Sequence, residues 1–220
     1  MLKKILSICF SLQLCMLLNA QDSKMSISLS PAVVQMPEWS VAIQPGIQHR
    51  INSRIAIIGE FCIPMVNISR DSHVSDQTYF RFKGELKYYL HSTPRTPYIS
   101  IESSYAYRQF NVQNSTFHKG NYYDTVVYGF QYASVRSPIW ITNLKIGREY
   151  KLGPRMGLDI FAGMGFRNIS THYSDVKGLT QEPYARPYCR IFPTSDPAWW
   201  FEANVFRFNA TFGFRFLYQF

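Results

Sequence analysis

Cysteine is scarce in this sequence, and its scarcity argues against two classes of protein. Four cysteines occur in 220 residues, and two of them, Cys9 and Cys15, lie in an N-terminal apolar run. The remaining pair, Cys62 and Cys189, cannot form a disulfide scaffold. A single disulfide bond between them is neither predicted nor excluded, because sequence alone does not establish its geometry. CxxC spacing is absent and the histidines are scattered, so we expect neither a metal site nor a cofactor.

Long apolar runs are also absent after residue 20. No later stretch has 18 consecutive apolar residues, which excludes a polytopic helical membrane protein. Charged residues make up only 17% of the chain, whereas Phe, Tyr and Trp number 17, 15 and 4. A disordered chain is excluded, because disordered segments are poor in aromatic residues. A soluble β-protein and a membrane β-barrel both remain.

The first twenty residues have the pattern of a secretory signal peptide. Lys3 and Lys4 precede an apolar run over 5–18, and Ala20 puts a small residue before Gln21. The run is too short to span a bilayer, and a buried N-terminal helix is the weaker alternative. We expect a signal peptide at 1–20 and one exported barrel domain at 21–220. Cleavage would lower the formal charge from +9 to +7. A basic exported protein can meet anionic lipid or lipopolysaccharide, but +7 over 200 residues is a mild basicity, and we expect no nucleic-acid partner.

Strict alternation of apolar and polar residues is the strongest positive signal. From Phe206 to Phe220 the even positions read Phe, Phe, Ala, Phe, Phe, Phe, Tyr, Phe, and the odd positions between them are mostly polar. Successive strand side chains point to opposite faces, so this segment has one aromatic face and one polar face. A helix would distribute those rings around its whole circumference.

The same pattern predicts eight strands. They cover 26–35, 39–51, 55–65, 79–90, 98–108, 140–150, 156–166 and 206–220. Pro31 suggests an edge or a bulge in the first of them. The links at 52–53, 92–97 and 153–155 are short, whereas those at 66–77, 111–137 and 170–200 are long. Residues 122–135 look strand-like, so we expect strands to extend beyond the membrane there. Such asymmetry is typical of outer-membrane barrels.

Within each of these strands most charged residues share one parity, and most apolar residues share the other. We therefore predict an all-β, eight-stranded, antiparallel, up-and-down transmembrane barrel with mixed charges in its lumen and an apolar face toward lipid. A lipocalin-like soluble barrel is the alternative. The predicted lumen charges are Glu60, Glu85, Glu102, Glu149, Asp159, Arg81, Lys83, Lys87, Arg108, Lys145, Arg167, Arg207 and Arg215. The aromatics expected at the bilayer interface are Trp39, Tyr98, Trp140, Tyr150, Tyr218 and Phe220.

The final strand, 205–220, resembles the C-terminal assembly signal of bacterial outer-membrane barrels, which end in an aromatic residue preceded by aromatics at alternate positions. With the Asn52-Ser53 turn and the segment 157–166, residues 26–220 resemble the eight-stranded superfamily that includes the OmpA transmembrane domain, OmpX and OmpW, and more closely an uncharacterised family of such barrels. This resemblance implies an outer-membrane location, contact with outer-membrane lipids and lipopolysaccharide, and recognition of the final strand by the outer-membrane assembly machinery. It carries over no catalytic residue.

One short segment offers a catalytic alternative. His172 two residues before Ser174 is similar to the catalytic pair of the lipid A deacylase barrels, in which His is the base for a Ser nucleophile. Glu182 is the nearest residue that could orient His172, but it does not stand where that family's Glu would, and Asp175 replaces the usual Asn. These residues have two interpretations. They are polar residues at the point where the chain leaves a strand, or, as the alternative, they are the catalytic pair of a lipid A-modifying esterase.

We expect no chemistry from this chain. The link 171–200 is rich in Pro and aromatic residues, and binding a partner or packing on the barrel rim fit it equally. A conducting pore is disfavoured because eight strands leave little room inside. The sequence thus predicts a monomeric outer-membrane barrel with a structural or surface-interaction role.

Overall fold

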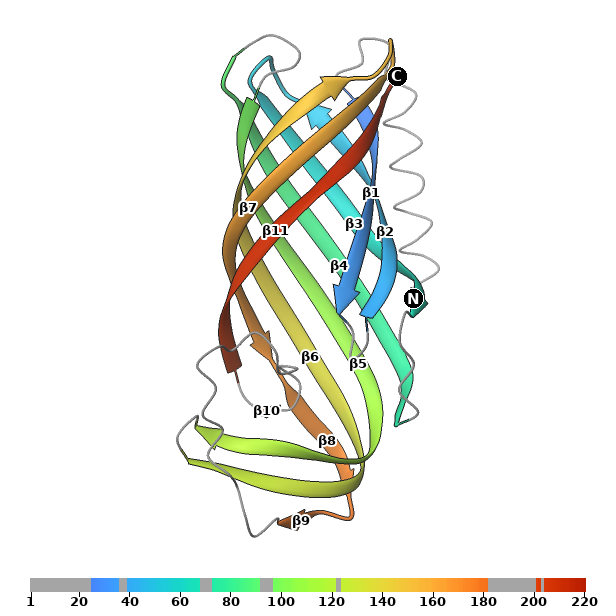
Figure 1. Cartoon of the computed structure of the whole chain (residues 1–220), viewed down its shortest axis with the longest axis vertical. Coiled ribbons are helices and arrows are strands. Elements are labelled where there is room, and N and C mark those ends of the chain that lie inside the picture. The colour runs from blue at the N-terminus through green and yellow to red at the C-terminus, as the bar shows by residue number, and fades with distance from the viewer. Residues whose placement is uncertain are drawn as a thin grey trace.

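The chain forms an all-β, closed barrel of eight antiparallel strands (Figure 1). The structure is a computed structural model that describes residues 25–35, 39–67, 73–91, 97–121, 124–181, 201–202 and 204–220. The expected signal peptide, Glu182 and Cys189 lie outside these ranges. Within them, no helix is long and apolar enough to cross a membrane.

Eight long strands make the wall, and the prediction of their number and order is confirmed. They are β1 (Met25–Gln35), β2 (Trp39–Arg50), β3 (Ile55–Asn67), β4 (Val74–Tyr89), β5 (Pro97–Asn121), β6 (Asp124–Lys151), β7 (Met156–Ser170) and β11 (Asn204–Gln219). Each strand pairs with its sequence neighbour, β7 pairs with β11, and β1 pairs with β11 to close the wall. Three short strands lie outside it: β8 (His172–Lys177), β9 (Thr180–Gln181) and β10 (Phe201–Glu202).

The strands are staggered around the barrel. Successive Cα partners lead from Arg207 through β7, β6, β5, β4, β3, β2 and β1 back to Leu217, ten residues further along β11. A stagger of this kind requires tilted strands, and for eight strands it leaves an interior just wide enough for side chains. The lumen is therefore a place for packed side chains.

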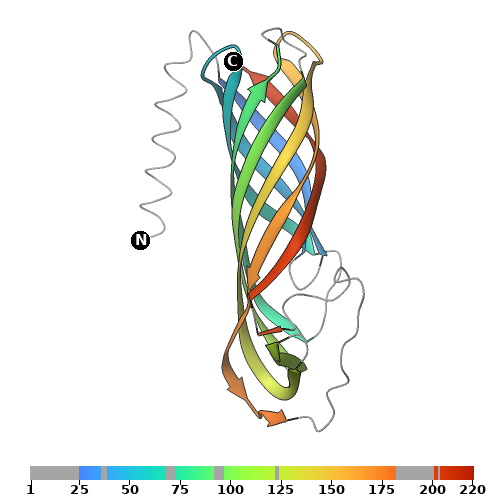
Figure 2. The same cartoon turned by 90° about the vertical axis from the view of Figure 1, so that its left-hand side faces the viewer.

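One end of the barrel carries an extension, on the side opposite the three short turns. β5 and β6 run past the other strands and pair continuously from Ser115 with Phe130 to Asn121 with Asp124 (Figures 1 and 2). β8 and β9 join the free side of β6, and β10 pairs in parallel with β5. The expected long link at 111–137 is thus mostly a hairpin, and the prediction of strand structure over 122–135 is confirmed for 124–135.

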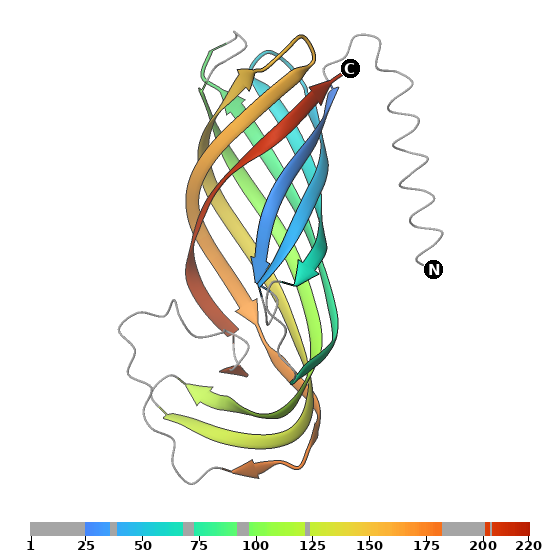
Figure 3. The same cartoon turned by 45° about the vertical axis from the view of Figure 1, so that its right-hand side comes forward.

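The closing seam between β1 and β11 is short. Only four pairs join these strands, from Ser26 with Gln219 to Leu29 with Phe216, whereas β1 pairs with β2 along its whole length. Beyond Leu29 the two strands diverge (Figure 3). The last paired residue lies two positions before Pro31, which has no backbone N–H to give to a ladder. The expectation of an edge or bulge at Pro31 agrees with this divergence.

The wall is apolar outside and polar inside. Large hydrophobic side chains stay exposed along every long strand, and Phe212 at 89% is the extreme case. The charged residues of the opposite parity are buried in the lumen; Lys87, Lys145, Asp159 and Arg215 are each 0% exposed. This arrangement is the reverse of a water-soluble barrel, which does not support the lipocalin-like alternative.

Candidate functional site

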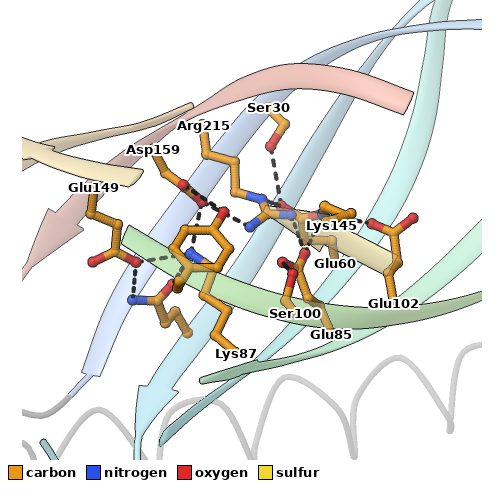
Figure 4. A network of polar contacts seen from close by, with 12 residues as sticks. Ser30, Glu60, Glu85, Lys87, Ser100, Glu102, Lys145, Glu149, Asp159 and Arg215 are labelled. Carbon is orange, nitrogen blue, oxygen red and sulfur yellow. Dashed lines mark hydrogen bonds and ion pairs between the residues drawn. The ribbon is translucent and has the colours of Figure 1, made fainter. Parts of the chain in front are cut away.

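Ten charged side chains in the half of the lumen nearest the short turns form one ion-pair network, called here the inner network. Figure 4 labels its members other than Arg50 and Lys83. Alternation along β2 to β7 and β11 points every one of them inward. Its members are Glu60, Glu85, Glu102, Glu149 and Asp159 with Arg50, Lys83, Lys87, Lys145 and Arg215. Five carboxylates meet five cations, so the network has no net formal charge.

Arg215 is the centre of the inner network. Its Nε lies 2.8 Å from Glu60 Oε1 and its Nη1 lies 3.0 Å from Asp159 Oδ2, while Nη2 pairs with Glu85. One guanidinium thus joins β11 to β3, β4 and β7. The planar fork of Arg suits several carboxylates at once, which a Lys ammonium at this position could not match.

Two lysines extend the inner network to either side of Arg215. Lys87 Nζ lies 2.7 Å from Asp159 Oδ2 and 2.8 Å from Glu149 Oε1. Lys145 Nζ lies 2.6 Å from Glu85 Oε2 and 3.0 Å from Glu102 Oε2. A buried charge is costly without a partner, and each carboxylate here has at least one cation. The arrangement fits a plug that fills the lumen.

Tyr98 belongs to this plug, and its expected place at the bilayer interface is wrong. Its side chain is 1% exposed, and its hydroxyl donates to Asp159 Oδ1 at 2.7 Å. Room for the ring comes from Gly147 on β6, where a Cβ would lie 2.4 Å from the ring carbon Cζ of Tyr98. Tyr89 likewise directs its hydroxyl into the inner network and donates to Glu149 Oε1 at 2.6 Å. Of the other expected interface residues, Trp140, Tyr150, Tyr218 and Phe220 are exposed, and the side chain of Trp39 lies outside the described residues.

The other half of the lumen carries four arginines, called here the outer arginines: Arg81, Arg108, Arg167 and Arg207. All face inward, as predicted, but they do not belong to the inner network. Arg167 and Arg207 are direct cross-strand partners on β7 and β11. Arg108 lies close enough to both to interact with their charges, and it contacts Ser137 Oγ at 3.4 Å.

Acidic residues are rare near the outer arginines in the described part of the chain. Asp76 and Asp175 are exposed, and Asp124 belongs to the tip of the β5–β6 hairpin. Glu202, on β10, lies 3.2 Å from Lys119 Nζ. Two buried Nε atoms, of Arg81 and Arg167, have no hydrogen-bond partner among the described residues. Counted over the described residues alone, the outer half of the lumen therefore carries more cations than carboxylates, whereas the inner half has equal numbers of both.

The extension has its own apolar core. Phe110, Val112, Phe117, Phe130, Ala133 and Val135 are buried together. Tyr173 of β8 stacks on Phe117 with 4.4 Å between ring centroids, and burial raises the pKa of its phenol. This core holds β5, β6 and β8 together beyond the barrel wall.

The structure shows no hydrogen bond between His172 and Ser174, the two residues of the esterase alternative. His172 Nε2 lies 3.0 Å from Ser170 Oγ, and Ser174 Oγ donates to the carbonyl oxygen of Ser134 at 3.4 Å. No hydrogen bond links His172 with Ser174 in the described chain, and Glu182 falls outside it. Cys62 is a buried free thiol. Its possible disulfide partner, Cys189, lies outside the described residues. The described residues contain no group of three or more metal-ligating side chains.

Comparison with known proteins identifies no family for this chain. No protein-family model and no curated protein matches the chain. Among solved structures, it is similar to the crystal structure of Neisserial surface protein A (NspA), with 12% sequence identity and a TM-score of 0.37. The match covers 89% of this chain and 95% of that one. This likeness assigns no function to the chain.

Proposed function

We propose that the chain is an integral outer-membrane β-barrel with a plugged lumen and a structural or surface-interaction role. The observation that carries the proposal is the reversed polarity of the wall. A contiguous apolar surface of this extent is unstable in water, whereas lipid satisfies it. The inner network satisfies the opposite face internally.

The height of the apolar wall fits a bilayer. Phe206 and Tyr218 are twelve residues apart on β11, and both are exposed. At ~3.3 Å per residue and a tilt of ~40° they are separated by about 30 Å along the barrel axis. The hydrocarbon band of an outer-membrane barrel is about 25 Å tall, so these rings suit its two boundaries.

We also propose a barrel type, an export route and an orientation for the chain. We place the chain with the small barrels of the OmpA, OmpX and OmpW type, exported by its signal peptide and recognised by the assembly machinery through β11. The β5–β6 extension lies opposite the short turns, which is the outer side in such barrels. It would face the environment and lipopolysaccharide, and the protein would act as a monomer.

The test substitutes the most exposed ring of the wall. Phe212 lies midway between Phe206 and Tyr218, so Phe212→Lys would put a charge near the bilayer midplane. We expect it to lower the free energy of unfolding in lipid vesicles by about 2–4 kcal/mol. The control Phe212→Leu should stay close to the wild type. Urea titration of the refolded protein measures both.

A water-soluble protein would behave in the opposite way, because exchanging an exposed Phe for Lys costs nothing in water. An unchanged stability of Phe212→Lys would contradict the proposal. So would a wild-type protein found in a detergent-free periplasmic fraction. In outer-membrane fractions, the folded chain should resist SDS without heating and change its gel mobility on boiling.

A further inference from the structure

The outer surface of the barrel carries a groove near the short turns, over β5, β6, β7 and β11. Its volume is about 670 Å³. Ala162 on β7 lies between its cross-strand partners, Ile146 on β6 and Phe212 on β11. All three side chains face outward and are exposed, and Ile99 and Ile160 line the groove further. The groove exists because a methyl group separates two large side chains.

One arginine faces outward in this groove, on the side of the short turns. Arg148 pairs with Pro97 on β5 and with Ile160 on β7, and all three side chains are exposed. The lipid-facing positions of these strands and of β11 are, within the described residues, the odd numbers of 97–107 and the even numbers of 140–150, 156–168 and 206–220. Arg148 carries the only formal charge among them. A charge that faces lipid is costly unless it lies near the interface or has a partner.

Arg148 lies at the level of phospholipid headgroups. It is three residues from Lys151, the last residue of β6, and its guanidinium lies over the ring of Tyr150, with 5.4 Å between Cζ and the ring centroid. Tyrosine rings of this kind settle at the membrane interface. Ala162 pairs with Ile146, so it lies one outward position further from the short turns than Arg148. The groove therefore runs from the interface toward the middle of the bilayer, as an acyl chain does.

The end of the β6–β7 hairpin is basic. Residues 146–158 contain Arg148, Lys151 and Arg155, and all three side chains are exposed. The single acid of this segment, Glu149, faces the lumen and pairs there with two cations of the inner network. Cations grouped in this way attract a phosphate. A guanidinium has five N–H donors, so Arg148 can bind a phosphate beside the contacts that it makes within the chain.

We propose that this groove binds an anionic glycerophospholipid of the periplasmic leaflet, with Arg148, Lys151 and Arg155 around its phosphate and one acyl chain along Ala162. This inference rests on the proposed function, which puts the groove in lipid and the short turns on the periplasmic side. A second copy of the chain fits the groove less well. In a symmetric dimer through this face, the same three cations of both copies would meet.

The binding test uses the chain 21–220 refolded in a neutral detergent. Native mass spectrometry follows titration with palmitoyl-oleoyl phosphatidylglycerol, and phosphatidylcholine with the same acyl chains is the zwitterionic comparison. We expect one phosphatidylglycerol to bind each protein before any phosphatidylcholine does, because only the first lipid carries a net negative charge. Equal binding of the two lipids would overturn the proposal.

A double variant tests the cations. Arg148→Gln with Lys151→Gln should bind phosphatidylglycerol about tenfold more weakly, because a hydrogen bond to a charged group contributes about that much. Arg54→Gln is the matched control, since Arg54 is an exposed arginine of the β2–β3 turn on the opposite side of the wall. It should bind like the wild type. Wild-type binding by the double variant would overturn the proposal.

A second variant tests the groove without changing any charge. Ala162→Phe fills the groove and should weaken the binding of phosphatidylglycerol about threefold or more, because the acyl chain loses its packing contacts. Ala210→Phe is the matched control, since Ala210 also faces outward but does not line the groove. Both variants should keep the heat-dependent gel shift. Equal effects of the two substitutions on binding would overturn the proposed place of the acyl chain.

Glycerol phosphate presents the headgroup chemistry without acyl chains. If it displaces phosphatidylglycerol at equal concentration, the cations take a free phosphate and the lipid proposal is overturned. A dimer that phosphatidylglycerol does not dissociate would assign the groove to a second copy and would also overturn it. A protein that shows the gel shift but fails these tests leaves the proposed function intact, whereas a protein without the shift contradicts the proposed function first.

Discussion

At the residue scale, the lumen depends on small residues as much as on charges. Gly147 leaves the space that the ring of Tyr98 occupies, and that ring delivers its hydroxyl to Asp159. Gly46 does the same for Glu60, whose Cγ would lie 2.5 Å from an added Cβ. In a lumen this narrow, a glycine opposite a large side chain is a packing requirement.

We predict that Gly147→Ala destabilises the barrel. The added methyl would overlap Tyr98 and displace it from Asp159, at a cost of about 1–3 kcal/mol. Gly84→Ala is the matched control, since nothing lies within 4 Å of a Cβ there. It should leave stability unchanged or raise it slightly. Urea unfolding in vesicles compares the two variants, and equal effects would contradict this account of Tyr98.

The misplacement of Tyr98 has a physical cause. An aromatic residue at a strand end suits the membrane interface equally well as the lumen, and its phenol makes it amphipathic in either place. Strand parity decides between them, because Tyr98 shares the parity of Ser100 and Glu102. The partner that holds it, Asp159, is 61 residues away in the sequence, and the pairing of β5 and β7 with the two sides of β6 brings the two together.

At the element scale, alternation located all eight wall strands, since it is a local property of each segment. The outer ends of β4, β5 and β6 were harder to place. Both faces of these segments carry polar and apolar residues, and Asp76 and Asn114 have positive φ angles of 51° and 48° that break the regular pattern. The seam was beyond prediction in detail, although Pro31 pointed to it, because pairing between the first and last strands depends on the whole barrel.

We predict that Phe117→Ala loosens the β5–β6–β8 extension and leaves the wall intact. The ring packs on Tyr128, Phe130 and Tyr173, and its loss should cost about 3–5 kcal/mol in the stability of that unit. Limited proteolysis of whole cells should cut the extension of this variant faster than that of the wild type. The gel shift on boiling should stay the same.

The control for this prediction is Thr116→Ala, which changes an exposed neighbour on the opposite face. It should be cut at the wild-type rate. Loss of the gel shift in Phe117→Ala would show that the extension and the wall fold as one unit, contrary to the prediction.

At the scale of the whole molecule, the barrel has two unlike halves. The inner half is closed by paired charges with no net charge, and the outer half has an excess of arginines over carboxylates in the part of the chain that the structure describes. The inner network crosses the lumen from β11 to β3, β4 and β7 through a single guanidinium.

This architecture predicts a barrel that does not conduct. Planar bilayers containing the refolded protein should show no stable single-channel steps, because the inner network fills the lumen and its charges are held in place by one another. A general porin in the same membranes is the positive control. Stable ohmic steps that scale with protein concentration would show that the network opens in a bilayer.

The four-residue seam also bears on how the barrel is made. β1 and β11 lie almost the whole chain apart, so bringing them together carries the largest loop-closure entropy of any pairing in the molecule. The hydrogen bonds of four ladder pairs offset only a small part of that entropic cost. We therefore expect closure to be the last and most reversible step of folding. The chain would remain for much of its assembly a curved sheet with two free edges, and Pro31 would keep part of those edges apart in the finished barrel.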